Sequence, residues 1–64
     1  MTLAERIATV ERGIRMAWEN RRYEQSVGRP HEAAAAAKRI RGYIKLLREL
    51  DAIAAREAQK IAAE

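Results

Sequence analysis

The feature that most constrains the fold is a long helical periodicity in residues 33–61. Apolar residues recur there at intervals of three, four and seven positions, as Ile40, Ile44 and Leu47 illustrate. This spacing places apolar side chains on one face of an α-helix. Adjacent apolar rows of seven-residue spacing together cover roughly 200° of the helix circumference. A single partner helix covers a stripe of roughly 100°, so the pattern predicts a helix that packs against more than one neighbour.

A shorter helical pattern precedes this one. Thr2 and Glu5 have the spacing of a capping box, in which each side chain accepts a hydrogen bond from the backbone N–H of the other residue. Gly13 interrupts the pattern and costs about 1 kcal/mol relative to alanine. Gly13 is explained either as a residue that the helix merely tolerates or as a point where two helices approach closely. The apolar row of this first helix comprises Leu3, Ile7, Val10, Ile14 and Ala17.

The first helical pattern changes after Trp18. The next positions on its apolar row are Arg21 and Gln25, which are both polar. The apolar residues of this stretch share the opposite side of the helix; they are Met16, Tyr23 and Val27. These side chains either cover the turn, remain in solvent or form a second contact surface.

The clearest break in the chain lies at residues 26–30. Gly28 suits the left-handed conformation that follows a helix C-terminus, and Pro30 fits the first turn of the next helix. We therefore predict an all-α fold with a single domain over residues 1–64, a coiled-coil-like antiparallel two-helix hairpin. Its helices span about 3–27 and about 30–62, and its turn spans 28–30. The second helix outruns the first by about two turns, which leaves Ala58 and Ile61 without a partner.

The size of the chain predicts assembly. A domain of 64 residues buries a small core, and the absence of cysteine rules out disulfides and cysteine zinc sites as a source of stability. Oligomerisation supplies what such a core lacks. We predict a homodimer, most simply a four-helix bundle. Arg39 and Glu57 flank the apolar face, where coiled coils place the charges that select a partner. The predicted oligomer interface comprises Leu46, Leu50, Ile53 and Ala54.

Charge is concentrated in the half of the chain around the predicted turn. Residues 21–48 carry eight basic and two acidic side chains, whereas the whole chain has a net charge of +4. On the second helix, cations gather mainly on the side away from the apolar rows. Such a surface can follow nucleic-acid phosphates, meet an acidic protein or keep the protein in solution. The candidate nucleic-acid contacts are Lys38, Arg41, Lys45 and Arg48.

Several function classes have no residues to support them. The chain has a single histidine, His31, and no cysteine, and its acidic residues are spread among basic ones. We therefore predict no enzymatic activity, no catalytic residues, no metal site and no cofactor. No apolar run approaches the roughly 18–20 residues that span a bilayer, and Glu5 and Arg6 interrupt the stretch where a signal peptide needs an apolar core. The expected location is cytoplasmic, away from membranes.

We predict a small helical protein-binding module, that is, an adaptor, inhibitor or assembly factor of regulatory character. Tyr, Trp and Arg are the residue types that most often carry interface energy. The predicted partner-binding surface is the late part of the first helix with its neighbouring arginines: Arg15, Trp18, Arg21, Arg22, Tyr23, Val27 and Arg29. The competing interpretation is that Trp18 and Tyr23 cap the end of the bundle.

The alternative function is nucleic-acid binding by a dimeric helical bundle that uses its basic, turn-proximal half. In size and two-helix outline the chain resembles the Rop family of plasmid RNA-binding hairpin dimers. The resemblance covers this outline and no motif, so no functional position is carried over from that family. It implies a dimeric bundle and an RNA partner.

Overall fold

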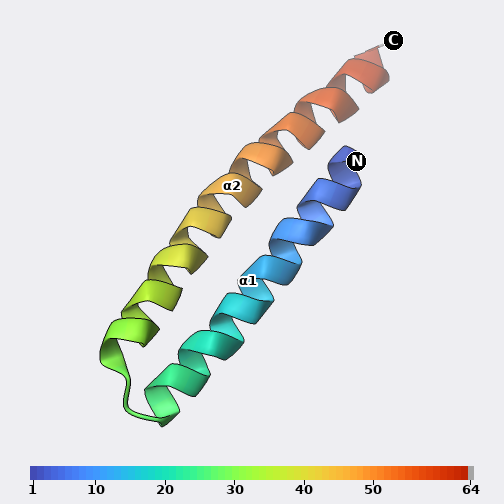
Figure 1. Ribbon diagram of the computed structural model, residues 1–64. Helices are drawn as coiled ribbons and strands as arrows, with labels where there is room; N and C mark the ends of the chain where they lie inside the picture. The colour runs from blue at the N-terminus through green and yellow to red at the C-terminus, as the bar shows by residue number, and fades with distance from the viewer. Residues whose placement is uncertain (64) are drawn as a thin grey trace.

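The computed structural model describes residues 1–63 and consists of two antiparallel α-helices (Figure 1). Helix α1 spans Leu3–Ser26 and helix α2 spans Pro30–Ala63. They pack side by side into a rod with extents of 55 × 16 × 14 Å. The predicted all-α hairpin is confirmed, and both helices end within one residue of the predicted boundaries.

The start of α1 is fixed by the predicted capping box. The Thr2 hydroxyl oxygen accepts a hydrogen bond of 3.1 Å from the Glu5 backbone N–H. The Glu5 carboxylate accepts one of 3.3 Å from the Thr2 backbone N–H. Two backbone donors that an α-helix leaves without partners are thereby satisfied.

The turn between the helices forms a Schellman motif, with Gly28 in the left-handed conformation at φ 73°. The Arg29 backbone N–H donates to the Glu24 carbonyl at 2.9 Å, and the Gly28 N–H donates to the Gln25 carbonyl at 3.3 Å. Pro30 then begins α2, where its missing N–H costs nothing. The Gly28 and Pro30 predictions are therefore confirmed.

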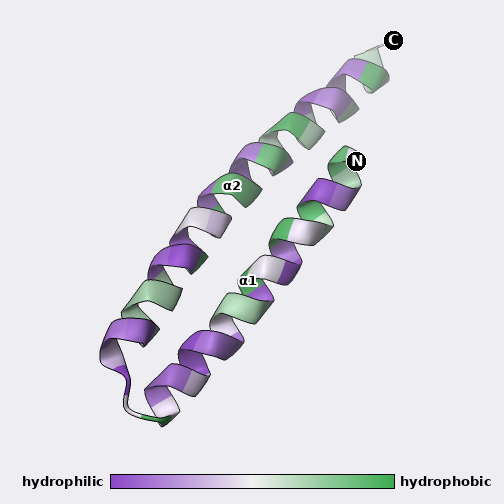
Figure 2. Ribbon diagram, in the orientation of Figure 1, coloured by the Kyte–Doolittle hydropathy of each residue, from purple (hydrophilic) through white to green (hydrophobic). Residues whose placement is uncertain are grey.

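The core of the hairpin is a thin seam between the helices. Three of its six buried hydrophobic side chains are alanines, so little apolar surface is removed from water; the six are Val10, Ala17, Ala33, Ala36, Ile40 and Leu50. Larger aliphatic residues on the seam, such as Ile14 and Leu47, are half-buried. In Figure 2 the turn-proximal half of α1 is mostly hydrophilic, because the apolar row of that helix stops after Ala17.

Gly13 marks a close approach between the two helices. A Cβ atom at this position would lie 3.1 Å from the Tyr43 ring, which is closer than ordinary van der Waals contact. The tyrosine ring of α2 therefore packs directly on the glycine backbone of α1. Of the two explanations for Gly13, the structure supports the close approach.

The end of α2 runs past the start of α1 (Figure 1). Residues 55–63 are all exposed, including Ala58 and Ile61. Within residues 1–63 this segment has no covering helix, as the sequence predicted.

Candidate protein-interaction surfaces

One side of the hairpin carries an apolar face, which we define as Met16, Tyr43, Leu46 and Ile53. Met16, Tyr43 and Leu46 line a shared shallow groove that also includes Gly13. Leu46 and Ile53 lie seven positions apart, so they project from the same side of α2. The exposed fractions are 66% for Met16, 41% for Leu46 and 37% for Ile53. These values are high for large apolar side chains, so the apolar face is open to a second molecule.

The apolar face exists because α1 covers only part of the apolar arc of α2. Ile40 is buried against α1 and Leu47 is half-buried. Leu46 precedes Leu47 by one position, about 100° away around the helix. The row that contains Leu46 and Ile53 therefore lies beside the seam, where α1 covers it only in part.

The structure separates the residues predicted for the oligomer interface into two groups. Leu46 and Ile53 are exposed on the apolar face, whereas Leu50 is buried between α1 and α2 and Ala54 is half-buried there. Leu50 thus belongs to the core of the hairpin itself. Only the outer row is available to a second copy without rearranging the hairpin.

A second surface lies on the other side of α1, and we call it the arginine–tryptophan surface: Arg15, Trp18, Arg21 and Arg22. The Trp18 side chain is 46% exposed. The Arg21 guanidinium carbon lies 5.1 Å from the centroid of the Trp18 ring, which is cation–π distance. Arg21 and Arg29 also line a groove against Ala33 and Ala37 of α2.

Tyr23 lies away from the arginine–tryptophan surface. Five positions separate Trp18 from Tyr23, which corresponds to about 140° around a helix. Tyr23 instead continues the seven-residue row of Met16, and both are exposed. Val27, at the C-cap of α1, is also exposed. The predicted partner-binding residues of α1 therefore fall on two sides of that helix, and Arg29 lies in the turn.

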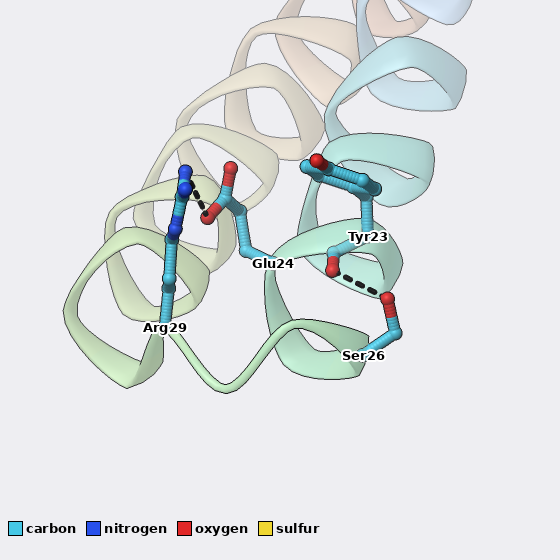
Figure 3. Close-up of polar contacts among 4 residues, drawn as sticks. All are labelled: Tyr23, Glu24, Ser26 and Arg29. Carbon is cyan, nitrogen blue, oxygen red and sulfur yellow. Dashed lines mark hydrogen bonds and ion pairs between the residues drawn. The ribbon is translucent and has the colours of Figure 1, made fainter.

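Glu24 is a buried carboxylate that sequence reasoning missed (Figure 3). Within residues 1–63 its Oε2 atom has no hydrogen-bond partner, and it lies 3.8 Å from an Arg29 guanidinium nitrogen. That distance is too long for a hydrogen bond. Nearby, the Ser26 hydroxyl donates to the Tyr23 carbonyl at 2.7 Å. The missed signal is a seven-residue row, which runs through Leu3, Val10, Ala17 and Glu24 and places the carboxylate on the seam.

The four predicted nucleic-acid contacts are exposed on α2; they are Lys38, Arg41, Lys45 and Arg48. Their spacing of three and four positions places them on one side of the helix. This side lies away from the seam and is separate from the apolar face. It forms a cationic row on the outer surface of the hairpin.

Among residues 1–63, no group of three or more His, Asp or Glu side chains is placed to hold a metal ion. Neither helix, over those same residues, has a stretch long and apolar enough to cross a membrane. Comparison with protein-family models, curated proteins and solved structures found no match to this chain.

Proposed function

We propose that this chain is a small non-enzymatic protein-binding module, an adaptor, inhibitor or assembly factor that acts through exposed helix faces. The observation that carries the proposal is the apolar face, where Met16, Leu46 and Ile53 are each more than a third exposed. Contiguous exposed apolar surface usually marks an interaction site. Such a surface costs solubility, so a helix that needed only to cover α1 would place polar residues there.

The first partner in this proposal is a second copy, which completes a homodimeric four-helix bundle. The thin seam supports this step, because alanines supply half of its buried hydrophobic residues. Small domains with little buried apolar area commonly gain stability by oligomerisation. Covering the apolar face adds the larger side chains that the hairpin leaves outside.

The arginine–tryptophan surface serves the second partner, a different protein. It combines the large apolar area of Trp18 with the guanidinium groups of Arg21 and Arg22, a combination enriched at the energetic centres of interfaces. It also lies on the other side of α1 from Met16. Dimerisation through the apolar face therefore leaves it free.

Light scattering at micromolar concentration tests the homodimer, and we expect the mass of two chains. Leu46→Glu should give a folded monomer, because it places a charge in the apolar face. Ala52→Glu, which alters an exposed position about 120° around α2 from Leu46, is the matched control and should remain dimeric. A wild-type protein that is folded and monomeric would contradict the homodimer.

Affinity capture from the source cell tests the second partner. We expect a protein retained by the wild type and lost with the double variant Trp18→Ala, Arg22→Ala. Circular dichroism must show that the variant keeps the wild-type helix content and melting temperature. Identical captured proteins for both forms would refute the assignment of this surface, and a large fall in melting temperature would assign Trp18 to the fold.

A second candidate function is nucleic-acid binding, favoured by the exposed cationic row of Lys38, Arg41, Lys45 and Arg48. Phosphate contacts release counterions, so such binding weakens steeply as salt rises. Fluorescence anisotropy with generic RNA and duplex DNA over a salt series measures this. Replacing the four cations with glutamine should abolish the binding. If the wild type binds neither RNA nor DNA at low salt, nucleic-acid binding is refuted and the protein-binding function remains.

A further inference from the structure

One row of exposed residues on α2 carries charges of opposite sign at its two ends. Its members are spaced by seven positions, so each lies about 20° around the helix from the next and the row winds slowly along one side of α2. A left-handed supercoil of two packed helices keeps such a row in contact. All members of the row are exposed; they are Glu32, Arg39, Leu46, Ile53 and Lys60. The row has an acidic residue at one end, a basic residue at the other and Leu46 at its centre.

We propose that a second copy of this chain docks antiparallel along this row, α2 against α2, with Leu46 at the two-fold axis. The proposal rests on the homodimer proposed above and adds its direction and register. In an antiparallel pair centred on Leu46, position 46 faces its own copy. Position 39 faces 53, and position 32 faces 60.

The charges favour this direction over the parallel one. Antiparallel docking brings Glu32 of one copy to Lys60 of the second copy, at both ends of the interface. Parallel docking in register would place Glu32 against Glu32 and Lys60 against Lys60. Facing charges of opposite sign stabilise helix pairs and like charges destabilise them, which is how coiled coils set orientation.

Arg39 fits opposite Ile53 in this register. The aliphatic stem of an arginine can lie along apolar surface while its guanidinium group remains in water. Glu49 and Glu57 lie one turn on either side of Ile53, so each offers a carboxylate to the Arg39 head group of the second copy. The stem of Arg39 then covers the Ile53 side chain of the second copy, and its guanidinium group lies near an acidic residue.

The length of α2 matches this register. The helix spans Pro30–Ala63, so its midpoint lies between residues 46 and 47. Two copies centred on Leu46 consequently overlap along their whole length. The uncovered residues 55–63 of one copy then lie beside the first turns of α2 in the other, where the small, exposed Ala35 lies one turn from both Glu32 and Arg39 and allows close packing. The end of α2 that lacks a partner within the hairpin gains one.

The docking surface runs along the outer side of α2 and includes Met16 and Tyr43 at its edge. The cationic row and the arginine–tryptophan surface stay outside it.

Crosslinking of single-cysteine variants tests the direction, because the chain contains no cysteine of its own. A short bismaleimide is suitable, since packed helix axes lie roughly 8–10 Å apart. We expect Leu46→Cys to crosslink with itself. Arg39→Cys and Ile53→Cys should each stay largely uncrosslinked alone and should crosslink when mixed. Ala52→Cys, exposed about 120° around α2 from Leu46 and outside the docking row, reports the background from random collisions.

The outcomes distinguish a dimer with another direction or register from the absence of any dimer. Self-crosslinking of Arg39→Cys and of Ile53→Cys would establish a parallel dimer, which overturns the arrangement and leaves the homodimer intact. A folded monomer in light scattering would overturn both. A dimer in which Leu46→Cys crosslinks no more than Ala52→Cys would also overturn the arrangement.

A double-mutant cycle tests the charge pairing. Glu32 and Lys60 are 28 positions apart in the same helix, about 42 Å, so they cannot interact within one chain. We expect Glu32→Gln and Lys60→Gln each to weaken the dimer by roughly two- to fivefold. The double variant should be weakened by less than the product of the single effects. Strictly multiplicative effects would show that the two residues do not meet, which would contradict this register.

Discussion

At the scale of single residues, Glu24 is a carboxylate buried within the hairpin. The residue is 8% exposed, and its Oε2 atom has no hydrogen-bond partner within residues 1–63. A buried, unsatisfied polar group costs about 1–3 kcal/mol. We predict that Glu24→Leu raises the free energy of unfolding by about that amount, measured by urea denaturation.

The matched control for Glu24 is Glu19→Leu, at an exposed position of the same helix. Surface substitutions of this kind change stability by about 0.5 kcal/mol or less. A loss of stability in Glu24→Leu would mean that the ion pair with Arg29, at 3.8 Å, stabilises the turn by more than the burial costs.

The two glycines within the helices should respond differently to the same substitution. Alanine is favoured over glycine in a helix by about 1 kcal/mol. At Gly42 nothing lies within 4 Å of the added Cβ, whereas at Gly13 the Tyr43 ring lies at 3.1 Å. In the monomeric Leu46→Glu variant, where no second copy covers Gly42, we predict that Gly42→Ala raises the free energy of unfolding by about 1 kcal/mol. Gly13→Ala should raise it by less or should lower it. Equal gains in thermal denaturation would show that the Tyr43 ring moves aside at no cost.

At the scale of the elements, Leu50 joins α2 to α1 near the open end of the hairpin. It is the largest buried aliphatic side chain of that half of α2. Truncating a buried leucine to alanine costs about 2–5 kcal/mol. We predict a loss of that size for Leu50→Ala, measured by chemical denaturation, with weakening of dimer and fold together. A loss below about 1 kcal/mol would show that the open end contributes little to stability.

The sequence was sufficient to predict the elements, because their boundaries depend on local chemistry. Thr2 with Glu5, and Gly28 with Pro30, act on residues a few positions away, so their effects can be deduced without coordinates. The buried position of Glu24 follows from the seven-residue row of Leu3, Val10 and Ala17. The polar Arg21 and Gln25 instead indicated that the buried row of the first helix had already ended. The pairing of Gly13 with Tyr43 depends on the relative shift and rotation of two helices. No local pattern specifies these quantities.

The candidate surfaces were predicted less completely for the same reason. The exposed fractions of Met16 and Tyr23 agree with their place off the apolar row of α1. Whether Trp18 and Tyr23 share a surface depends on where α2 lies around α1. The assignment of Leu50 to the hairpin core, with Leu46 outside it, depends on the same rotation.

At the scale of the whole molecule, the proposed homodimer would make the melting temperature depend on protein concentration. Binding that occurs only between folded chains raises the melting temperature by mass action. We predict that the melting temperature rises by several degrees when the concentration is raised about a hundredfold. In Leu46→Glu it should be constant, because that variant is expected to melt as a monomer. A wild-type melting temperature independent of concentration would contradict the dimer.

Trp18 also gives the protein an optical reporter of binding. It is the only tryptophan in the chain, and it is nearly half exposed beside the Arg21 guanidinium group. Its emission in the native state should therefore already resemble that of a hydrated indole, so unfolding will shift the spectrum little. A partner that covers the arginine–tryptophan surface will remove water from the ring and move the emission to shorter wavelength. Titrations can thus follow docking on this surface without any added label.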